Sequence, residues 1–172
     1  MHFVTYATVG WIDLFTRNEY RTILIDSLKH CMANKGLDVC AWCIMTNHVH
    51  LIVSSRDKTL DSIMRDHKRH TSVALRTTIE KEVAESRREW IMGLFCRVGS
   101  GNSNNGGFQL WQQHNRPIEL YSRDVIMQKL NYIHSNPVKA GFVEKAEDWL
   151  WSSARAYAGM GDWLEGLRMI ED

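Results

Sequence analysis

The spacing of apolar and polar positions predicts an ordered series of strands and helices. Two-residue alternation or runs of β-branched residues indicate strands, and apolar residues every three or four positions indicate helices. Strands are expected at His2–Val9, Leu37–Met45 and His48–Ser54, with further strands in Ile91–Val98 and Phe108–Leu120. Helices are expected from about Thr16 to Asn34, from Thr59 to about Arg88, and from Arg123 to about Ser135. This order predicts an α+β fold, a ferredoxin-like sandwich with helices packed on an antiparallel sheet of four to five strands.

The length of 172 residues and the lack of an internal repeat predict one domain, residues 1–172, in which residues 142–172 are an acidic C-terminal extension packed on the core or trailing it. That extension holds three basic and seven acidic residues, although the whole chain has a formal net charge of +1. From Arg56 to Arg76, six basic residues accompany three acidic ones. This basic stretch suits a phosphate-bearing partner, and a solvated helix face explains it equally well.

No stretch has the apolar length of a membrane span and the amino terminus lacks a signal sequence, so we expect a cytoplasmic protein that binds no membrane. The four cysteines lie among apolar neighbours. Cys40 and Cys43 have the spacing of a zinc or redox pair, but residues three apart on a strand face opposite sides. We therefore interpret them as reduced core residues.

The run His48-Val49-His50-Leu51-Ile52-Val53 places two histidines on a predicted strand. Residues two apart on a strand share one face, so both imidazoles project the same way and are able to converge on one metal ion. Two solvated histidines on the polar face of a strand are the alternative interpretation.

The last predicted helix carries a tyrosine and an asparagine on one flank. Ser122 is expected to cap its start, and Pro137 is expected to end it. Tyr132 and Asn136 are four residues apart and so lie on neighbouring turns of that flank, whereas His134 points elsewhere. If the helix reaches the histidines, Asn136 offers an oxygen ligand beside the phenol. The alternative is a boundary tyrosine with its hydroxyl in water and Asn136 as a helix C-cap.

Four blocks in order resemble the REP-associated branch of the single-tyrosine HUH transposases, a superfamily that includes the IS200-like transposases. The resemblance extends from Phe3 to Ala158, nearly the whole chain. The blocks are Met45–Ile52, which holds the histidine–apolar–histidine triplet, Phe108–Gln112, Tyr132–Gly141 and Trp149–Ser153. Many relatives carry proline at the position of Thr46, and glutamine or histidine at that of Asn136.

The resemblance implies a divalent metal, Mg²⁺ or Mn²⁺, held by His48 and His50, with Asn136 as third ligand and Tyr132 as nucleophile. It implies a transposase that nicks and joins single-stranded DNA through a 5′-phosphotyrosine intermediate and a free 3′-hydroxyl. The expected partners are hairpin-bearing single strands, REP-like or at insertion-sequence ends, and the expected place is the prokaryotic cytoplasm or nucleoid, as monomer or homodimer. A divalent cation suits this chemistry because it polarises a phosphodiester, and a phenol with a pKa near 10 is otherwise a poor nucleophile.

DNA contacts are expected from cationic and polar residues on two predicted helices and near the proposed site. They are Asn47, Arg65, Lys68, Arg69, Arg116, Lys129 and Lys139. Trp11 and Trp111 are candidates for stacking on an unpaired base. Two other functions stay open at this point: a non-cleaving protein that binds structured nucleic acid and derives from a transposase, and a replication initiator or relaxase.

Overall fold

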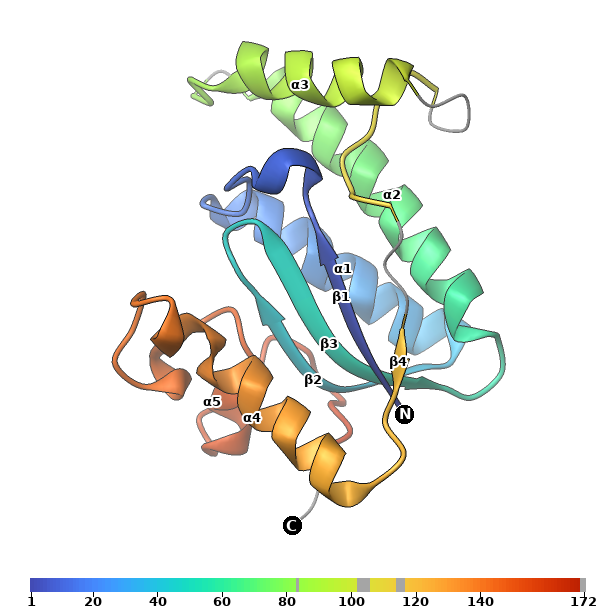
Figure 1. Ribbon diagram of the computed structural model, residues 1–172, viewed down its shortest axis with the longest axis vertical. Coiled ribbons are helices and arrows are strands. Elements are labelled where there is room, and N and C mark those ends of the chain that lie inside the picture. Colours follow the sequence, from blue (N-terminus) through green and yellow to red (C-terminus); the bar gives the residue numbers. More distant parts are fainter. Residues whose placement is uncertain (83, 102–105, 114–116, 171–172) are drawn as a thin grey trace.

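The computed structural model describes residues 1–82, 84–101, 106–113 and 117–170. Its elements follow one another along the chain as shown in Figure 1. They are β1 (His2–Ala7), η1 (Val9–Trp11), α1 (Asn18–Lys35), β2 (Leu37–Ile44), β3 (His48–Ser55), α2 (Leu60–Lys81), α3 (Arg88–Ser100), β4 (Ile118–Glu119), α4 (Arg123–Lys139), η3 (Ala146–Asp148) and α5 (Ala154–Tyr157).

The strands form one four-stranded antiparallel sheet in the order β2-β3-β1-β4. The first strand therefore lies inside the sheet, between the last strand and the β2–β3 hairpin, as in a ferredoxin-like β-α-β-β-α-β unit. β1 pairs with β3 along its whole length, from His2 opposite Val53 to Ala7 opposite His48. The predicted α+β fold, with helices packed on an antiparallel sheet, is confirmed.

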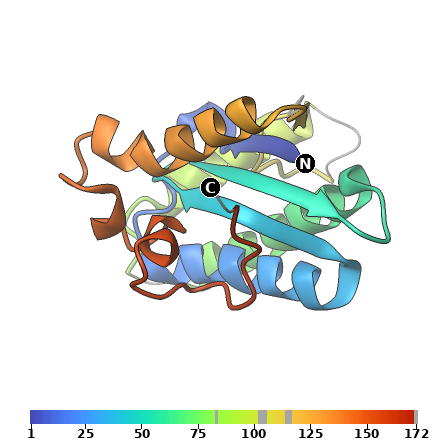
Figure 2. The same ribbon diagram turned by 90° about the horizontal axis from the view of Figure 1, so that it is seen from below.

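Helices cover both faces of the sheet. Figure 2 shows α4 on one side and α1 and α2 on the other. Val49, Leu51 and Val53 of β3 belong to the core under α1 and α2, whereas Ile52 belongs to the smaller core under α4. Because both faces are apolar at defined positions, a slip of one residue would exchange the two sets, and the register is fixed. The same alternation directs His48 and His50 toward α4.

The middle of the chain differs from the prediction. The helix expected to reach Arg88 ends at Lys81, and α3 replaces the strand predicted at residues 91–98. Ile91 and Phe95, both buried, are four residues apart on α3. A short apolar run does not distinguish a buried strand from one helical face, which explains the error.

A buried carboxylate holds the turn between α2 and α3. Glu85, whose side chain is 2% exposed, accepts hydrogen bonds from Arg17 Nε at 3.2 Å and Arg87 Nε at 3.0 Å. The hydrogen bond from Arg87 keeps the pKa of Glu85 below its usual value, so the carboxylate stays charged. Arg87 also donates to the Asp13 carbonyl. This turn therefore ties α3 to the segment between β1 and α1.

The region predicted to supply the last strands is mostly irregular. Among the residues of this region that the structure describes, Trp111 forms an isolated bridge with Thr8, and Ile118–Glu119 forms the short strand β4, which pairs with β1. Of the loop predicted at residues 100–107, residues 102–105 lie outside the described part of the chain.

Helix α4 is longer than predicted. It begins after its cap Ser122, whose hydroxyl accepts a backbone N–H, as expected. It continues to Lys139 instead of ending near Ser135, with Pro137 inside its last turn. A proline has no N–H for the helix, and Pro137, which is buried, stands two residues before the end of α4, where one such bond is lost without ending the helix. As a result, Asn136 remains helical.

The C-terminal segment covers the outer edge of β2. The Ile44 N–H donates to the Trp151 carbonyl at 2.8 Å, and the Ser153 N–H donates to the Trp42 carbonyl at 2.9 Å. This pairing closes an edge that would otherwise be open to another strand. Within the described residues, every helix is too short or too polar to cross a bilayer.

Cys40 and Cys43 are buried, free thiols. Burial raises their pKa values, to about 11 for Cys40 and about 12 for Cys43. The predicted placement of both cysteines in the core is confirmed. The prediction that they face opposite sides is wrong. A register shift between Val39 and Ala41 brings both thiols into the core under α4.

Candidate functional site

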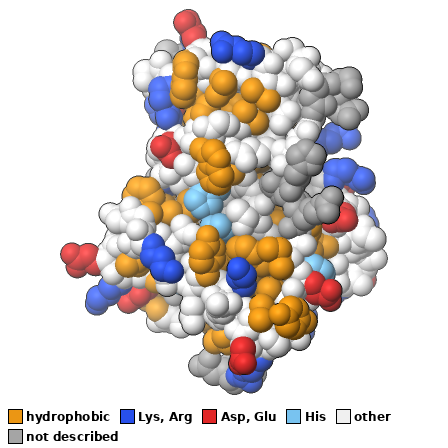
Figure 3. Space-filling model, viewed as in Figure 1, with side chains coloured by type: hydrophobic (Ala, Val, Ile, Leu, Met, Phe, Trp, Pro, Cys, Tyr) orange, Lys and Arg blue, Asp and Glu red, His pale blue; other side chains and the backbone are white. Residues whose placement is uncertain are grey.

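Two histidines lie side by side at the start of β3, on the face that α4 covers. The centroids of their imidazole rings are 4.6 Å apart and the ring planes cross at 78°. His50 is 3% exposed, whereas His48 is partly exposed. Figure 3 shows histidine side chains reaching the surface of this side of the molecule, bordered by hydrophobic ones.

Helix α4 brings Tyr132 and Asn136 to this pair. The ring centroid of Tyr132 lies 5.3 Å from that of His50, and Tyr132 is 39% exposed. One turn later, Asn136 Nδ2 lies 3.1 Å from His50 Nε2, a contact between residues 86 apart in sequence. Leu130 and Ile133 anchor the apolar side of the helix in the core under α4. The flank that carries the tyrosine therefore faces the histidines.

Asn47 fixes the orientation of His48. Its Nδ2 donates to the Trp11 carbonyl at 3.3 Å and to Asp13 Oδ1 at 3.0 Å, which leaves Oδ1 to accept from His48 Nδ1 at 2.6 Å. The Thr46 hydroxyl also donates to Asp13. The proton of His48 therefore lies on Nδ1 and its Nε2 keeps a lone pair. Burial lowers the pKa of His48. Asn47, predicted to contact DNA, has its amide engaged within the chain.

His50 has the same proton arrangement. Asn136 Nδ2 donates to its Nε2, so its proton lies on Nδ1, which donates to Thr5 Oγ1 at 2.7 Å. Phe3 stacks on the imidazole with ring centroids 5.7 Å apart. Burial lowers the pKa of His50 to about 3, and the nearby positive charge of Lys129 acts in the same direction. Both histidines are therefore neutral with an Nε2 lone pair, the form that ligates a metal.

Two lysines of α4 flank the tyrosine. Lys129 Nζ lies 5.5 Å from the centre of the Tyr132 ring and 4.8 Å from that of Phe3. Lys139 Nζ lies 5.9 Å from the centre of the Tyr132 ring. Of the residues predicted to contact DNA, these two cations lie beside the phenol, where their charge suits an anionic ligand.

Three other cations predicted to contact DNA lie on the opposite layer. Arg65, Lys68 and Arg69 belong to α2, which packs on the other face of the sheet from the histidines. Arg65 and Arg69 are exposed, whereas Lys68 is half-buried with its Nζ 5.9 Å from the centre of the Tyr6 ring, and burial lowers its pKa. Arg116 lies outside the described residues. The structure thus does not bring the α2 cations to the histidines.

The remaining tyrosines are away from the histidine pair. Tyr6 and Tyr20 are buried, Tyr157 donates to a backbone carbonyl, and Tyr121 is exposed ahead of α4. His134 bonds through Nε2 to a serine hydroxyl and points away from Tyr132, as predicted.

The donor set beside Tyr132 is two imidazoles and one amide. In the described part of the chain, no group of three or more histidine, cysteine, aspartate or glutamate residues is arranged to hold a metal ion. The Nε2 atoms of His48 and His50 nevertheless fit a divalent cation, and Asn136 adds an oxygen when its amide turns Oδ1 in place of Nδ2 toward the ion. Three neutral ligands leave the charge of such a cation uncompensated and available to a phosphate.

Sequence reasoning missed the residues that hold the two rings. Thr5 and Phe3 of β1 contact His50, and Asp13 supports Asn47. Thr5 and Phe3 occupy alternate positions of β1 and so share a face, but only the β1–β3 register shows that this face carries the histidines.

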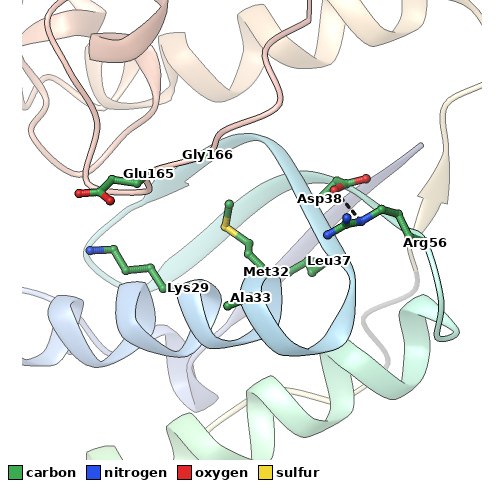
Figure 4. Close-up of a pocket in the computed structure, with 8 residues that line it drawn as sticks. All are labelled: Lys29, Met32, Ala33, Leu37, Asp38, Arg56, Glu165 and Gly166. Carbon is green, nitrogen blue, oxygen red and sulfur yellow. Dashed lines mark ion pairs between the residues drawn. The ribbon is translucent and has the colours of Figure 1, made fainter.

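A separate pocket of about 390 Å³ opens where α1, the end of the β2–β3 hairpin and the C-terminal segment meet (Figure 4). Met32 and Leu37 give it an apolar wall, and Asp38 is paired with Arg56 at its rim. None of its lining residues is a histidine, cysteine or tyrosine. Its lining therefore contains neither an imidazole ligand nor a phenol like those beside His50.

Similarity to known proteins adds to this geometry. Residues 10–104, more than half of the chain, match the sequence model of the family described as IS200-like transposases. A protein of Haemophilus influenzae (strain ATCC 51907 / DSM 11121 / KW20 / Rd), provisionally named a REP-associated tyrosine transposase, is 23% identical over 139 residues, which are 79% of this chain and 67% of that protein. The solved structure of a REP-associated tyrosine transposase bound to a REP hairpin has a TM-score of 0.64 at 18% identity, covering 95% of this chain and 82% of that chain. At this identity the structural likeness shows the fold alone.

Proposed function

The chain belongs to the IS200-like transposase family, and we propose that it is a metal-dependent endonuclease and strand transferase acting on single-stranded DNA at hairpin-associated sites. Tyr132 is its nucleophile, and His48, His50 and Asn136 hold Mg²⁺ or Mn²⁺. The observation that carries the proposal is the Tyr132 ring, 39% exposed, lying 5.3 Å from the ring of His50.

The residues around Tyr132 and the two histidines have distinct roles in this proposal. Asn47 and Thr5 hold the Nδ1–H groups of the histidines, so that both Nε2 atoms are presented together. When bound, the ion polarises the scissile phosphodiester and offsets charge on its oxygens. Lys129 and Lys139 draw the DNA backbone toward the phenol.

The proposed step exchanges one phosphate ester for another. The Tyr132 oxygen attacks phosphorus, a P–O(tyrosine) bond forms, and the bond to the 3′-oxygen breaks. The phenol proton passes to water, and the leaving oxygen takes a proton from water to become a free 3′-hydroxyl. Attack by a 3′-hydroxyl of another strand then releases Tyr132 and joins the DNA without ATP.

The hairpin in this proposal rests on the solved relative, which is bound to a REP hairpin. We propose hairpin-bearing single strands as the DNA partner of this chain as well, bound by a monomer or a homodimer.

A labelled hairpin tests the nucleophile. The probe is a pool of hairpin oligonucleotides with randomised single-stranded flanks, labelled at either end and incubated with Mn²⁺. We expect a denaturation-resistant adduct that carries the 3′ label and releases the 5′ label, since the tyrosine keeps the 5′-phosphate. Tyr132→Phe should abolish it, whereas the exposed control Tyr121→Phe should not. An adduct that persists in Tyr132→Phe removes that residue from the role, and hairpin binding without any adduct favours a binding protein.

The ion is tested separately from activity. Binding of Mn²⁺ to the DNA-free protein is followed by electron paramagnetic resonance. We expect His48→Ala to lose binding and His30→Ala, on the exposed side of α1, to keep it. Equal binding by the two variants, or cleavage that is unchanged in EDTA, contradicts the metal assignment.

A further inference from the structure

We infer that the indole of Trp11 is a stacking platform for one unpaired nucleobase of the DNA, in a nucleotide next to the phosphate that Tyr132 attacks. This inference rests on the proposed function. It concerns a residue that belongs neither to the donor set nor to the basic residues around the phenol.

Trp11 is exposed beside the candidate metal ligands. Its ring centroid lies 5.8 Å from that of His48, with the rings crossing at 72°. The residue is 57% exposed, so much of the indole is open to solvent. Trp111, the other tryptophan considered for stacking, is buried and donates through Nε1 to Thr71. The structure therefore leaves Trp11 as the candidate of the two.

The backbone at Trp11 does not call for a tryptophan. Its φ of 54° is in the left-handed region, which favours glycine and strains other residues. Its N–H donates to the Thr8 carbonyl at 3.1 Å, and its carbonyl accepts from Asn47 Nδ2 at 3.3 Å. On the side of Trp11 these bonds use backbone atoms only, so glycine would form them with less strain. The turn thus presents a large aromatic side chain at a cost, without burying it.

The loop around Trp11 is held in place from several sides. The Thr8 N–H donates to the Asn47 carbonyl at 2.9 Å, and the Thr8 hydroxyl donates to the Ile12 carbonyl at 2.8 Å. A Cβ at Gly10 would lie 3.3 Å from Leu94 of α3, so the loop also rests against that helix. An aromatic surface that is ordered before binding loses little conformational entropy when a ligand stacks on it.

An unpaired base is the occupant that these neighbours favour. Every base offers a π-face to an indole, whereas paired bases inside a hairpin stem are stacked on each other. Lys129 and Lys139 attract the phosphate backbone toward the phenol. Because Trp11 adjoins His48, a base on its indole belongs to a nucleotide that flanks the reacting phosphate. The single-stranded flank of the substrate, not its stem, therefore meets Trp11.

Substitutions at Trp11 test this role by DNA affinity. The probe is a fluorescein-labelled 12-residue oligothymidylate, and its Kd is measured by anisotropy in Mg²⁺. Since stacking on one aromatic side chain contributes roughly 1–3 kcal/mol by alanine substitution, we expect Trp11→Ala to raise the Kd about 5- to 150-fold. Trp11→Phe should recover most of the affinity, and Tyr121→Ala, exposed at the opposite end of the sheet, should bind like the unsubstituted protein.

Trp11→Gly separates stacking from a structural role. It relieves the left-handed strain, so its thermal midpoint should equal or exceed that of the unsubstituted protein while its Kd rises as in Trp11→Ala. In addition, an oligothymidylate carrying one 5-iodouracil should crosslink under ultraviolet light to the peptide that contains Trp11.

Unchanged affinity of Trp11→Ala, an equal loss in Tyr121→Ala, or no binding of oligothymidylate by the unsubstituted protein overturns the inference. The proposed function fails on a different result, namely the absence of a Tyr132–DNA adduct. If the Tyr132–DNA adduct forms and Trp11→Ala binds with unchanged affinity, the stacking role of Trp11 is refuted and the proposed function stands. Weakened binding of that variant without an adduct contradicts the nuclease assignment, and it leaves Trp11 as a surface on which an unpaired base stacks.

Discussion

His67 is a buried neutral imidazole, and replacing it should change how the stability of the protein depends on pH. It lies on α2 and is 1% exposed, between the Tyr6 hydroxyl at 2.7 Å from Nε2 and the Ser27 hydroxyl at 2.9 Å from Nδ1. Its pKa is lowered from 6.5 to about 3, chiefly by burial, and the charges of His70 and Lys68 act in the same direction. At a pH between these two pKa values, the imidazole of His67 carries a proton in the unfolded chain and none in the folded chain.

The sign of the effect follows from this difference in bound protons. The contribution of a neutral His67 to stability is fully present above pH 6.5 and is lost as the pH falls toward 3, because protonation favours the unfolded chain. One proton corresponds to about 1.4 kcal/mol per pH unit, so the loss between pH 7.5 and pH 4.5 is about 2.5 kcal/mol.

Urea unfolding at a series of pH values measures this loss. We expect His67→Gln to be less stable than the unsubstituted protein at pH 7.5, and the gap in unfolding free energy to shrink by about 2.5 kcal/mol at pH 4.5. His50 and His134 titrate in both proteins, so their contributions cancel. Tyr6→Phe removes a hydrogen bond but leaves His67 buried, and its pH dependence should parallel that of the unsubstituted protein. A gap that is constant with pH would refute the assignment of a buried neutral imidazole.

Three further predictions address packing, charge and metal binding. A Cβ on Gly99 of α3 would lie 2.3 Å from the Phe108 backbone nitrogen, so Gly99→Ala should lower the unfolding free energy by about 1–3 kcal/mol. Gly93→Ala on the same helix meets nothing within 4 Å and should raise it by about 0.5–1 kcal/mol; calorimetry that shows equal effects contradicts this packing. Glu85→Gln should cost about 1–2 kcal/mol in urea unfolding, a modest loss because its arginine partners are partly exposed, and no loss would show that the ion pairs do not stabilise the turn. Asn47→Ala should weaken Mn²⁺ binding about 10- to 100-fold by releasing His48, and unchanged affinity in the electron paramagnetic resonance titration would exclude that positioning role.

Local patterns in the sequence determined most of the elements that carry the site. The alternation of β3 predicts that His48 and His50 share a face, because side chains two apart on a strand always do. The four-residue spacing of Tyr132 and Asn136 predicts that they share a helix flank. These rules need only a few neighbouring residues, and the structure agrees with them.

Other features followed from contacts between residues far apart in the chain. Residues 91–98, predicted to form a strand, belong to α3, whose residues Ile91 and Phe95 are buried in the core under α1 and α2. Pro137 lies buried inside the last turn of α4, and a shift of register in β2 puts Cys40 and Cys43 on one side. Each outcome depends on what lies opposite in space, which short-range patterns do not contain.

The sequence by itself determined that a histidine pair, a helix-borne tyrosine and an asparagine exist on suitable faces. Only the tertiary structure decided that α4 packs on the histidine face of the sheet while Arg65, Lys68 and Arg69 lie on the other layer. It also decided that Thr5 and Asn47 hold the two imidazoles. The physical reason is the distance along the chain over which each interaction acts. Hydrophobic periodicity is set within one helical turn or one strand. The hydrogen bond between His50 and Asn136 joins residues 86 apart, and it forms only when both faces of the sheet are packed.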